Sequence, residues 1–433
     1  MSDPDKLRQI SASDSPAMAA LAASESMAPS EPALPGLPLA EYPASRGFWA
    51  LTWQQFRKRR ESYIALFALG LLFLMAFSAP LLANNLPWFV RSPQGISMPL
   101  LRDYVAPISA LDRFYNCAFM ALIAIFFWRL IARAVRRGDS TRVSMSRVVN
   151  CWLLVFGCLF ALAAWIGGKN DTADYRAKAE MPGTSAVFTL IPYGVLEINL
   201  ALNDRPPSGG HLLGNDNDGY DVLTRIVHGS RISLAVGFLA IGLAVSIGIV
   251  VGSLSGYFGG VVDIVASRII EVFICFPSFF LILTIISIAP TRSIFWVMFA
   301  IGLTGWMGIA RLIRGEVLKV RQLDYIAAAK ALGAQDMRII FRHILPNALA
   351  PVLVAATFGI AGAILSETAL GFLGLGVEPP TPSWGELLNQ ARENPVRLWW
   401  LMVYPGFMIF LSVTLMNLVG EGLRDAMDPR LRK

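Results

Sequence analysis

Charged residues are scarce in this chain. They make up 15% of its 433 residues, whereas 55% of the residues are hydrophobic. A typical soluble domain carries about 25% charged residues. The composition therefore excludes an ordinary soluble globular or disordered class and indicates a membrane protein.

Histidine and cysteine are also scarce. The three histidines are far apart in the sequence, and the four cysteines, Cys117, Cys151, Cys158 and Cys275, all fall in apolar stretches. No pair has the spacing or context of a metal site. We therefore expect no metal site, and we expect the cysteines to be small buried hydrophobic side chains.

A phosphate-binding loop is missing as well. Gly167-Gly168-Lys169 lacks the required glycine five residues before Gly168, and Asn170 stands where Ser or Thr is needed. Any step driven by ATP would therefore need another chain to bind the nucleotide. The net charge of +7 does not indicate a nucleic-acid partner, because the basic residues cluster in loops beside apolar runs.

Long apolar runs are the most prominent feature that is present. A spanning helix needs about 20 apolar residues, and eight segments reach or approach that length. They are 64–83, 114–131, 148–167, 232–257, 264–289, 294–310, 348–377 and 398–420. The predicted fold class is all-α, a polytopic membrane helix bundle with about eight transmembrane helices.

Loop charges orient this bundle. The loop 129–147 carries six Arg against one Asp, and the loop 311–347 carries seven Lys or Arg against three acids. Segment 168–231 has six basic and eight acidic residues. Basic loops stay in the cytoplasm, so both termini are expected on the cytoplasmic side. Residues 1–46 are rich in Ala, Ser and Pro and are predicted to be a disordered cytoplasmic tail. Segment 48–60 is either a helix lying in the membrane interface or a basic flank of the first span.

Between two spans lies a block that predicts a compact pair of short helices. Asp324 is expected to cap the first helix through its side chain, and Gly333 to close it in a left-handed conformation. Asp336 is expected to cap the second helix, and Pro346 to end it. Such a protrusion could press on a soluble partner.

This block resembles the coupling loop of ATP-binding-cassette importer permeases. Ala328, Ala329, Gly333, Leu345 and Pro346 stand at the family's spacings. Ala327 replaces a usual Glu and His343 a usual Ile, departures that are common in the dipeptide/oligopeptide/nickel branch. The resemblance implies that the residues contacting the ATPase are Asp324, Tyr325, Ala327, Ala328, Ala329, Lys330, Leu332, Gly333, Leu345 and Pro346.

The likeness extends over roughly 205–429. Its most specific part begins at Glu367 with Glu-Thr-Ala-Leu-Gly-Phe-Leu-Gly-Leu-Gly. The first span, with Ala83-Asn84-Asn85, is similar to the oligopeptide/microcin-C permease subgroup, whereas 103–200 match no family pattern. The expected organisation is the tail, 47–102 with the interfacial helix and first span, an inserted region 103–200 with two extra spans, a periplasmic segment 201–231, and the permease core 232–433 with its coupling loop 311–347. Because the insertion lies outside the family-like stretches, we expect a six-span core that is complete without it.

Two carboxylates interrupt the apolar runs. Intramembrane carboxylates are costly and often functional. Glu271 can simply pair with Arg268 one helical turn away, and Glu367 is expected to have an architectural role. With Pro277, these two residues are the candidates for the permease core and a possible pathway. The run from Asn215 to Gly219 is predicted to be a capping turn rather than a calcium loop.

The resemblance implies a non-catalytic permease subunit of an importer that moves peptides or peptide-like solutes from periplasm to cytoplasm. The implied partners are a second permease forming a heterodimer, two ATPase subunits, a periplasmic binding protein and the lipid bilayer. No cofactor is expected on this chain, with ATP and magnesium held by the ATPases. The implied location is the bacterial inner membrane. The alternative is an ion-coupled carrier or channel working without ATPases, which should bury carboxylates in several spans.

Overall fold

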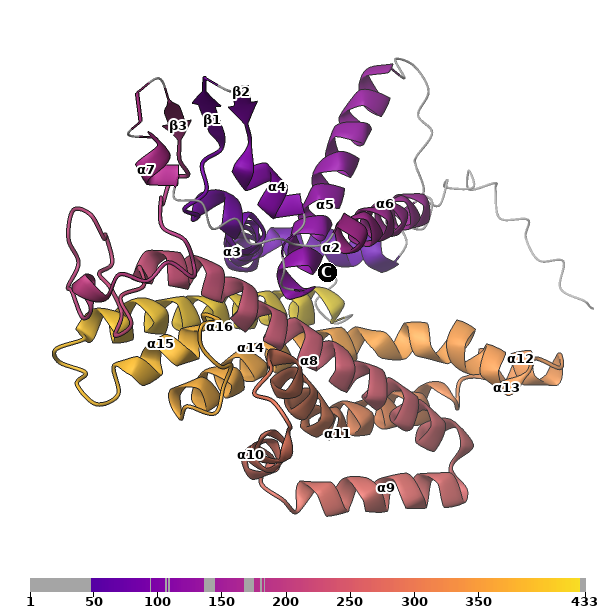
Figure 1. Ribbon diagram of the computed structural model, residues 1–433. Helices are drawn as coiled ribbons and strands as arrows, with labels where there is room; N and C mark the ends of the chain where they lie inside the picture. Colours follow the sequence, from indigo (N-terminus) through magenta and orange to yellow (C-terminus); the bar gives the residue numbers. More distant parts are fainter. Residues whose placement is uncertain are drawn as a thin grey trace, which may run out of the picture. The chain divides into compact units, whose positions relative to one another are not determined.

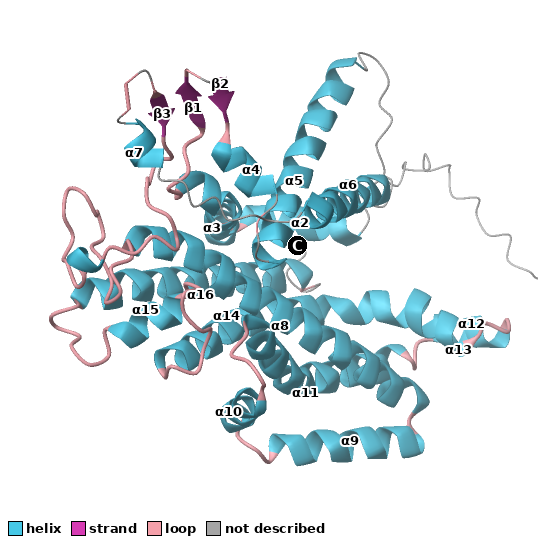
Figure 2. Cartoon of the chain, viewed as in Figure 1, coloured by secondary structure: helices cyan, strands magenta, loops and turns pink. Residues whose placement is uncertain are grey.

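The computed structural model describes residues 48–93, 95–105, 107, 110–135, 145–166, 175–179, 181–182 and 184–428. Helices form most of the described chain, and its strands are three short ones (Figure 2), which confirms the predicted all-α class. The predicted tail 1–46 lies outside the described residues. Helix α2 (Phe48–Lys58) covers most of the segment predicted to be interfacial, and its placement in a membrane interface stays a prediction.

The longer of the remaining helices follow the predicted apolar runs, and shorter helices lie between them. They are α3 (Arg60–Leu82), α4 (Pro99–Val105), α5 (Ala110–Val135), α6 (Met145–Ile166), α7 (Tyr175–Ala179), α8 (Val222–Phe258), α9 (Gly260–Ile274), α10 (Ser278–Ile288), α11 (Ile294–Val320), α12 (Asp324–Ala331), α13 (Asp336–Ile339), α14 (Leu345–Phe372), α15 (Trp384–Gln390) and α16 (Trp399–Met427). Two short elements complete the set, the 3₁₀ turn η2 (Leu200–Leu202) and the π-helical turn η3 (Ile340–Ile344).

Five of the described helices are long and apolar enough to cross a membrane. They are α3, α8, α11, the continuous helix Asp336–Phe372, and α16. The pair α9 and α10 adds a sixth only if counted as one broken span. Helices α5 and α6 form where the two extra spans were predicted, but among the described residues neither meets the same test. A bundle of spanning helices is confirmed, while the count of eight stays a prediction.

The predicted span 264–289 is not one straight helix, and whether it crosses the membrane stays a prediction. The chain bends by 84° between α9 and α10. Pro277 stands at the N-cap of α10 with an extended ψ of 122°. Proline has no N–H to donate and pushes the preceding residue out of the helical region, so a straight helix cannot continue through it.

Small residues set the closest helix contact, as their spacing predicted. A Cβ atom added at Gly252 would lie 2.5 Å from the carbonyl oxygen of Ala310, and one at Gly256 would lie 2.9 Å from that of Arg314. These glycines of α8 therefore let α11 approach backbone to backbone. The cysteine prediction holds only for Cys117, which is buried, since the other three are exposed.

One small sheet was not predicted. Strands β1 (Phe89–Ser92), β2 (Gly95–Ser97) and β3 (Ser185–Val187) pair antiparallel in the order β2-β1-β3. Figure 1 shows it beside α7. Strands of three or four residues are too short to give a readable alternation of apolar and polar side chains. The sheet joins chain that precedes the inserted helices to chain that follows them.

The inserted helix α5 is tied to the core through a buried arginine. Arg231 of α8 donates from Nη1 to Asp112 Oδ1 at 2.7 Å and from Nη2 to Asn116 Oδ1 at 2.6 Å. Its Nε and Nη2 also donate to the carbonyls of Ala76 and Phe77 in α3. Tyr115 donates back to the Arg231 carbonyl at 3.0 Å. These bonds connect the insertion to the core, and the expectation of a core complete without it stays a prediction.

Candidate functional site

The predicted helix pair is present as α12 and α13. Figure 1 shows both at one end of α11 and α14, while α15 lies at the other end of the bundle. The loop is thus a protrusion between two long helices, in the place expected for a docking element.

Helix α12 begins at Asp324, the residue that was predicted to be its N-cap. Asp324 is the first residue of α12, the N-cap is Leu323, and no side chain caps the helix. The prediction that Asp324 caps α12 is therefore wrong. Its exposed carboxylate lies in the first turn, where a negative charge still interacts favourably with the helix dipole.

Gly333 closes α12 as predicted. It has a φ of +80°, its N–H donates to the Lys330 carbonyl at 3.0 Å, and the N–H of Ala334 donates to the Ala329 carbonyl at 3.1 Å. These two bonds form a Schellman motif, which requires a left-handed residue that glycine adopts without strain. The motif fixes the direction in which the chain leaves α12.

The second helix does not stop at Pro346. Instead α13 runs through the π-helical turn η3 into α14, and Pro346 occupies the first turn of α14. The wider π turn accommodates the missing N–H and the proline ring. The predicted proline stop is wrong for this reason, and the exit of the loop is a continuous helix.

Asp336 does not cap α13 either. The N-cap residue is Gln335, and no side-chain bond caps the helix. The Asp336 carboxylate instead accepts from the Tyr257 hydroxyl at 2.6 Å. Arg321 Nη1 donates to the Tyr257 carbonyl at 2.7 Å. Both bonds attach the loop to the end of α8.

The inner side of the loop is anchored in an apolar cluster. Ile326 of α12 and Ile339, Ile340 and Ile344 of the second helix are buried together with Val317 of α11. Leu345, among the predicted contact residues, is buried in the same cluster. This packing makes α12, α13 and the adjoining ends of α11 and α14 one mechanical unit.

The outer side of the loop is exposed and largely apolar. Leu332 is 88% exposed, Phe341 68% and Tyr325 43%. Of the other predicted contact residues, Asp324, Ala327, Ala328, Lys330, Gly333 and Pro346 are exposed and Ala329 is half-buried. Large apolar side chains held on a rigid base are typical of a surface that binds another protein.

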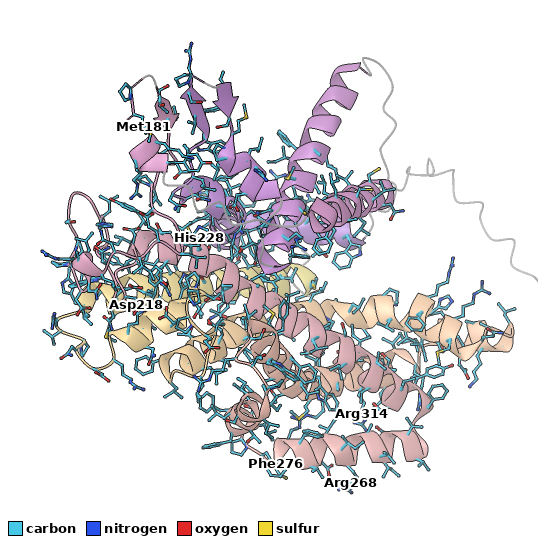
Figure 3. The ribbon with its side chains drawn as sticks, in the orientation of Figure 1. Met181, Asp218, His228, Arg268, Phe276 and Arg314 are labelled. Carbon is cyan, nitrogen blue, oxygen red and sulfur yellow. The ribbon has the colours of Figure 1, made fainter. Side chains whose placement is uncertain are left out.

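The three core candidates do not join this site. Glu271 of α9 accepts from Arg268 at 2.6 Å, and both side chains are exposed, so the predicted pairing is confirmed. Figure 3 labels Arg268 on α9 and Phe276, the residue before Pro277, at the bend that follows α9. Glu367 of α14 is fully buried and accepts from the Ser233 hydroxyl of α8 at 3.0 Å. It joins two helices, as an architectural role requires.

A buried charge cluster at the other end of the bundle was missed. Arg225 of α8 donates to Glu386 of α15 at 2.8 Å, and its Nε lies 3.2 Å from Asp216 Oδ2. Asp216 also accepts from the backbone N–H groups of Asp218 and Tyr220, which confirms the predicted turn. The cap of α8 is Asp221, which lies just outside the predicted run. Glu386 lies 161 residues from Arg225, so no local pattern could have identified this pair.

The stability of the folded protein should depend on pH through Asp216 of this cluster. Burial raises the pKa of Asp216 to about 6 from its usual 3.8, although Arg225 partly opposes the rise. A carboxyl whose pKa is raised by folding stabilises the folded state below pH 3.8, and that contribution is lost as the pH rises through 6. The difference between the melting temperatures of Asp216→Asn and wild type should therefore shift in favour of the variant as the pH rises from about 4 to about 7. Thermal unfolding of both purified proteins across this pH range measures the difference in melting temperature. A difference that does not change with pH would contradict the raised pKa of Asp216.

A polytopic helix bundle with a docking loop at one end defines a membrane transport subunit. The family described as "binding-protein-dependent transport system inner membrane component" matches residues 248–433, and the "N-terminal TM domain of oligopeptide transport permease C" matches residues 47–95. The chain belongs to this family of permeases and is a permease subunit of an ATP-binding-cassette importer. The candidate docking loop lies within the first match.

Three relatives support the assignment, and the matches cover 74% to 92% of their length. The chain is 43% identical over 226 residues to the dipeptide transport system permease protein DppC of Alkalihalophilus pseudofirmus, which covers 52% of this chain and 74% of the relative. It is 40% identical over 304 residues to a putative peptide transport system permease protein of Brucella suis, which covers 70% of this chain and 92% of the relative. It is also 37% identical over 241 residues to the oligopeptide transport system permease protein OppC of Bacillus subtilis, which covers 56% of this chain and 79% of the relative.

Proposed function

We propose that this chain is one half of the translocation pathway for peptides or peptide-like solutes. A second permease completes a heterodimer in the bacterial inner membrane, two ATPase subunits dock on the α12 side, and a periplasmic binding protein delivers the solute at the other end. Both chain termini lie in the cytoplasm in this arrangement. ATP and magnesium are held by the ATPases, and this chain carries no catalytic group.

The observation that carries this proposal is the two-sided docking loop. Its base is buried with α11, and its outer side presents Leu332 and Phe341 to solvent. Closure of the ATPases would therefore move α12 as a rigid lever. Because α13 continues through η3 into α14, no flexible linker separates the loop from α14. The movement would therefore be passed on to the spanning helices α11 and α14. The peptide substrate is supported by the names of the relatives.

Peptide uptake in reconstituted vesicles tests the proposal. The chain would be purified with its native partner subunits and inserted into liposomes together with the binding protein. We expect a labelled tripeptide supplied on the α15 side to cross only when ATP is supplied on the α12 side. The reverse placement of peptide and ATP serves as the control. Uptake without ATP, or driven by a proton gradient alone, would instead support an ion-coupled carrier.

A further inference from the structure

Helices α9 and α10 leave one continuous stretch of chain open to solvent. Every residue from Glu271 to Ser278 is exposed, across the end of α9, the 84° bend and the start of α10. Residues 275–277 belong to neither helix, and Phe276 at the bend is 55% exposed (Figure 3). The open face therefore includes irregular backbone as well as side chains.

The open stretch is fixed from behind by packing. Asp263 near the start of α9 accepts from Arg314 Nη2 of α11 at 2.6 Å. Ile270 of α9 is buried, and Ile282 and Ile286 of α10 are buried in one cluster with residues of α11. The bend is thus held rigidly on one side and is open on the other.

Two contacts place the bend at the depth of the middle of a spanning helix. Asp263 meets α11 at Arg314, near the docking loop. Ten residues further along α9, Phe273 packs edge to face on Trp306, with ring centroids 6.4 Å apart. Trp306 lies in the middle of α11 (Ile294–Val320). Helix α9 therefore runs alongside the half of α11 next to the docking loop (Figure 1), and the bend that follows lies level with the centre of the bundle.

Lipid is an unsuitable neighbour for this face. The side chains of Arg268 and Glu271 pair at 2.6 Å one turn before the bend, and they are 75% and 58% exposed. Charged side chains within a membrane rarely face lipid, and irregular backbone at that depth is buried in protein or lines a water-filled cavity. A dry contact with another protein would leave the remaining donors and acceptors of both charged groups without water. The exposed ion pair therefore favours a water-filled cavity.

We propose that the bend between α9 and α10 lines the water-filled pathway of the solute, and that the Arg268–Glu271 pair sets the charge selectivity of this pathway. The proposal rests on the proposed function and names one wall of its route. Together the two side chains carry no net charge, so they hold neither end of a zwitterionic peptide. Removing one partner leaves a unit charge that faces the solute.

The native Cys275 lies in the open stretch and reports whether water reaches it. A charged methanethiosulfonate reagent reacts with the thiolate, which forms in water and is suppressed in apolar surroundings. The importer would be assembled with its native partner subunits in liposomes, with the other three cysteines of this chain replaced by alanine. We expect the reagent, added on both sides, to label Cys275, as measured by mass spectrometry of this chain.

A cysteine on an unbroken spanning helix is the matched control. Leu71 lies in the middle of α3 and is 51% exposed. Leu71→Cys, in a chain whose four native cysteines are replaced by alanine, should be labelled at least about tenfold more slowly than Cys275, because its thiol stays in apolar surroundings.

Uptake of Ala-Lys-Ala and Ala-Glu-Ala by the same importer tests the ion pair. Glu271→Gln leaves Arg268 unbalanced and should lower the ratio of lysyl to glutamyl peptide uptake by about fivefold, the effect of one charge at roughly 4 Å in water. Arg268→Gln should raise the ratio by a similar factor. Asp204→Asn is the matched control, since it breaks an ion pair with Arg397 outside the spanning helices, and it should leave the ratio unchanged.

Each part of the proposal can fail by itself. Labelling of Cys275 no faster than that of Leu71→Cys would overturn the pathway assignment, because lipid or a dry contact with the second permease would then cover the bend. An unchanged ratio in both Glu271→Gln and Arg268→Gln would overturn the role of the ion pair. A wild-type importer that takes up neither peptide contradicts the proposed function, whereas normal uptake with an unlabelled Cys275 contradicts only the pathway assignment.

Discussion

Replacing Gly333 by valine should strongly reduce the stimulation of ATP hydrolysis by binding protein and peptide, while the chain still inserts in the membrane. Gly333 has a φ of +80°, where a β-branched side chain costs about 1–3 kcal/mol. The Schellman bonds that aim α12 would then be lost, although no Cβ clash adds to the strain, since nothing lies within 4 Å. Because about 1.4 kcal/mol of docking energy changes an equilibrium tenfold, stimulation should fall by about tenfold or more.

Three further variants make this test specific. Gly333→Asn should keep most of the stimulation, because asparagine tolerates the left-handed region. Gly70→Val changes an exposed helical glycine of α3 that also has open space around it, and it should have no effect on coupling. Leu332→Asp leaves the backbone alone and places a charge on the 88% exposed apolar tip, so it should also uncouple. Wild-type stimulation in both Gly333→Val and Leu332→Asp would place the coupling element elsewhere.

Local sequence patterns predicted the features that local physics determines. Apolar runs placed the long helices because a membrane span needs length and hydrophobicity. Gly333 could be predicted because only glycine enters its backbone region without strain. The small-residue spacing of Gly252 and Gly256 likewise predicted the close contact of α8 with α11.

The failures share a different cause. The chain bends sharply at Pro277, whereas the helix continues through Pro346. The difference is the π turn before Pro346, which depends on how Ile340 and Ile344 pack against α11. Arg225 and Arg231 could be recognised as basic residues near a helix start, but Glu386, Asp112 and Asn116 each lie more than 100 residues from the arginine that they bind. Long-range pairing of this kind leaves no periodic signal in one sequence.

Removing the α5 acceptors of Arg231 should destabilise the protein strongly. The guanidinium is 1% exposed and binds Asp112 and Asn116 of the inserted helix. Breaking a buried ion pair from one side costs about 3–5 kcal/mol, because the remaining charge stays buried without its partner. The double variant Asp112→Ala with Asn116→Leu should therefore lower the melting temperature by roughly 5 °C or more. Thermal unfolding of the purified chain in detergent measures this change.

A matched pair and a rescue distinguish lost charge pairing from lost packing. Arg268→Ala removes the exposed pair with Glu271 and should shift the melting temperature little, because exposed pairs contribute about 0–1 kcal/mol. Adding Arg231→Met to the double variant removes the orphaned charge and should restore part of the lost stability. If the double variant melts like wild type, α5 is not required by the core. If Arg231→Met restores nothing, α5 contributes by packing, since Tyr115 and Phe119 also lie against Phe77 of α3. If Arg231→Met restores part of the lost stability, the inserted helix is the electrostatic partner of a core arginine. A variant that lacks the whole insertion should then fail to assemble.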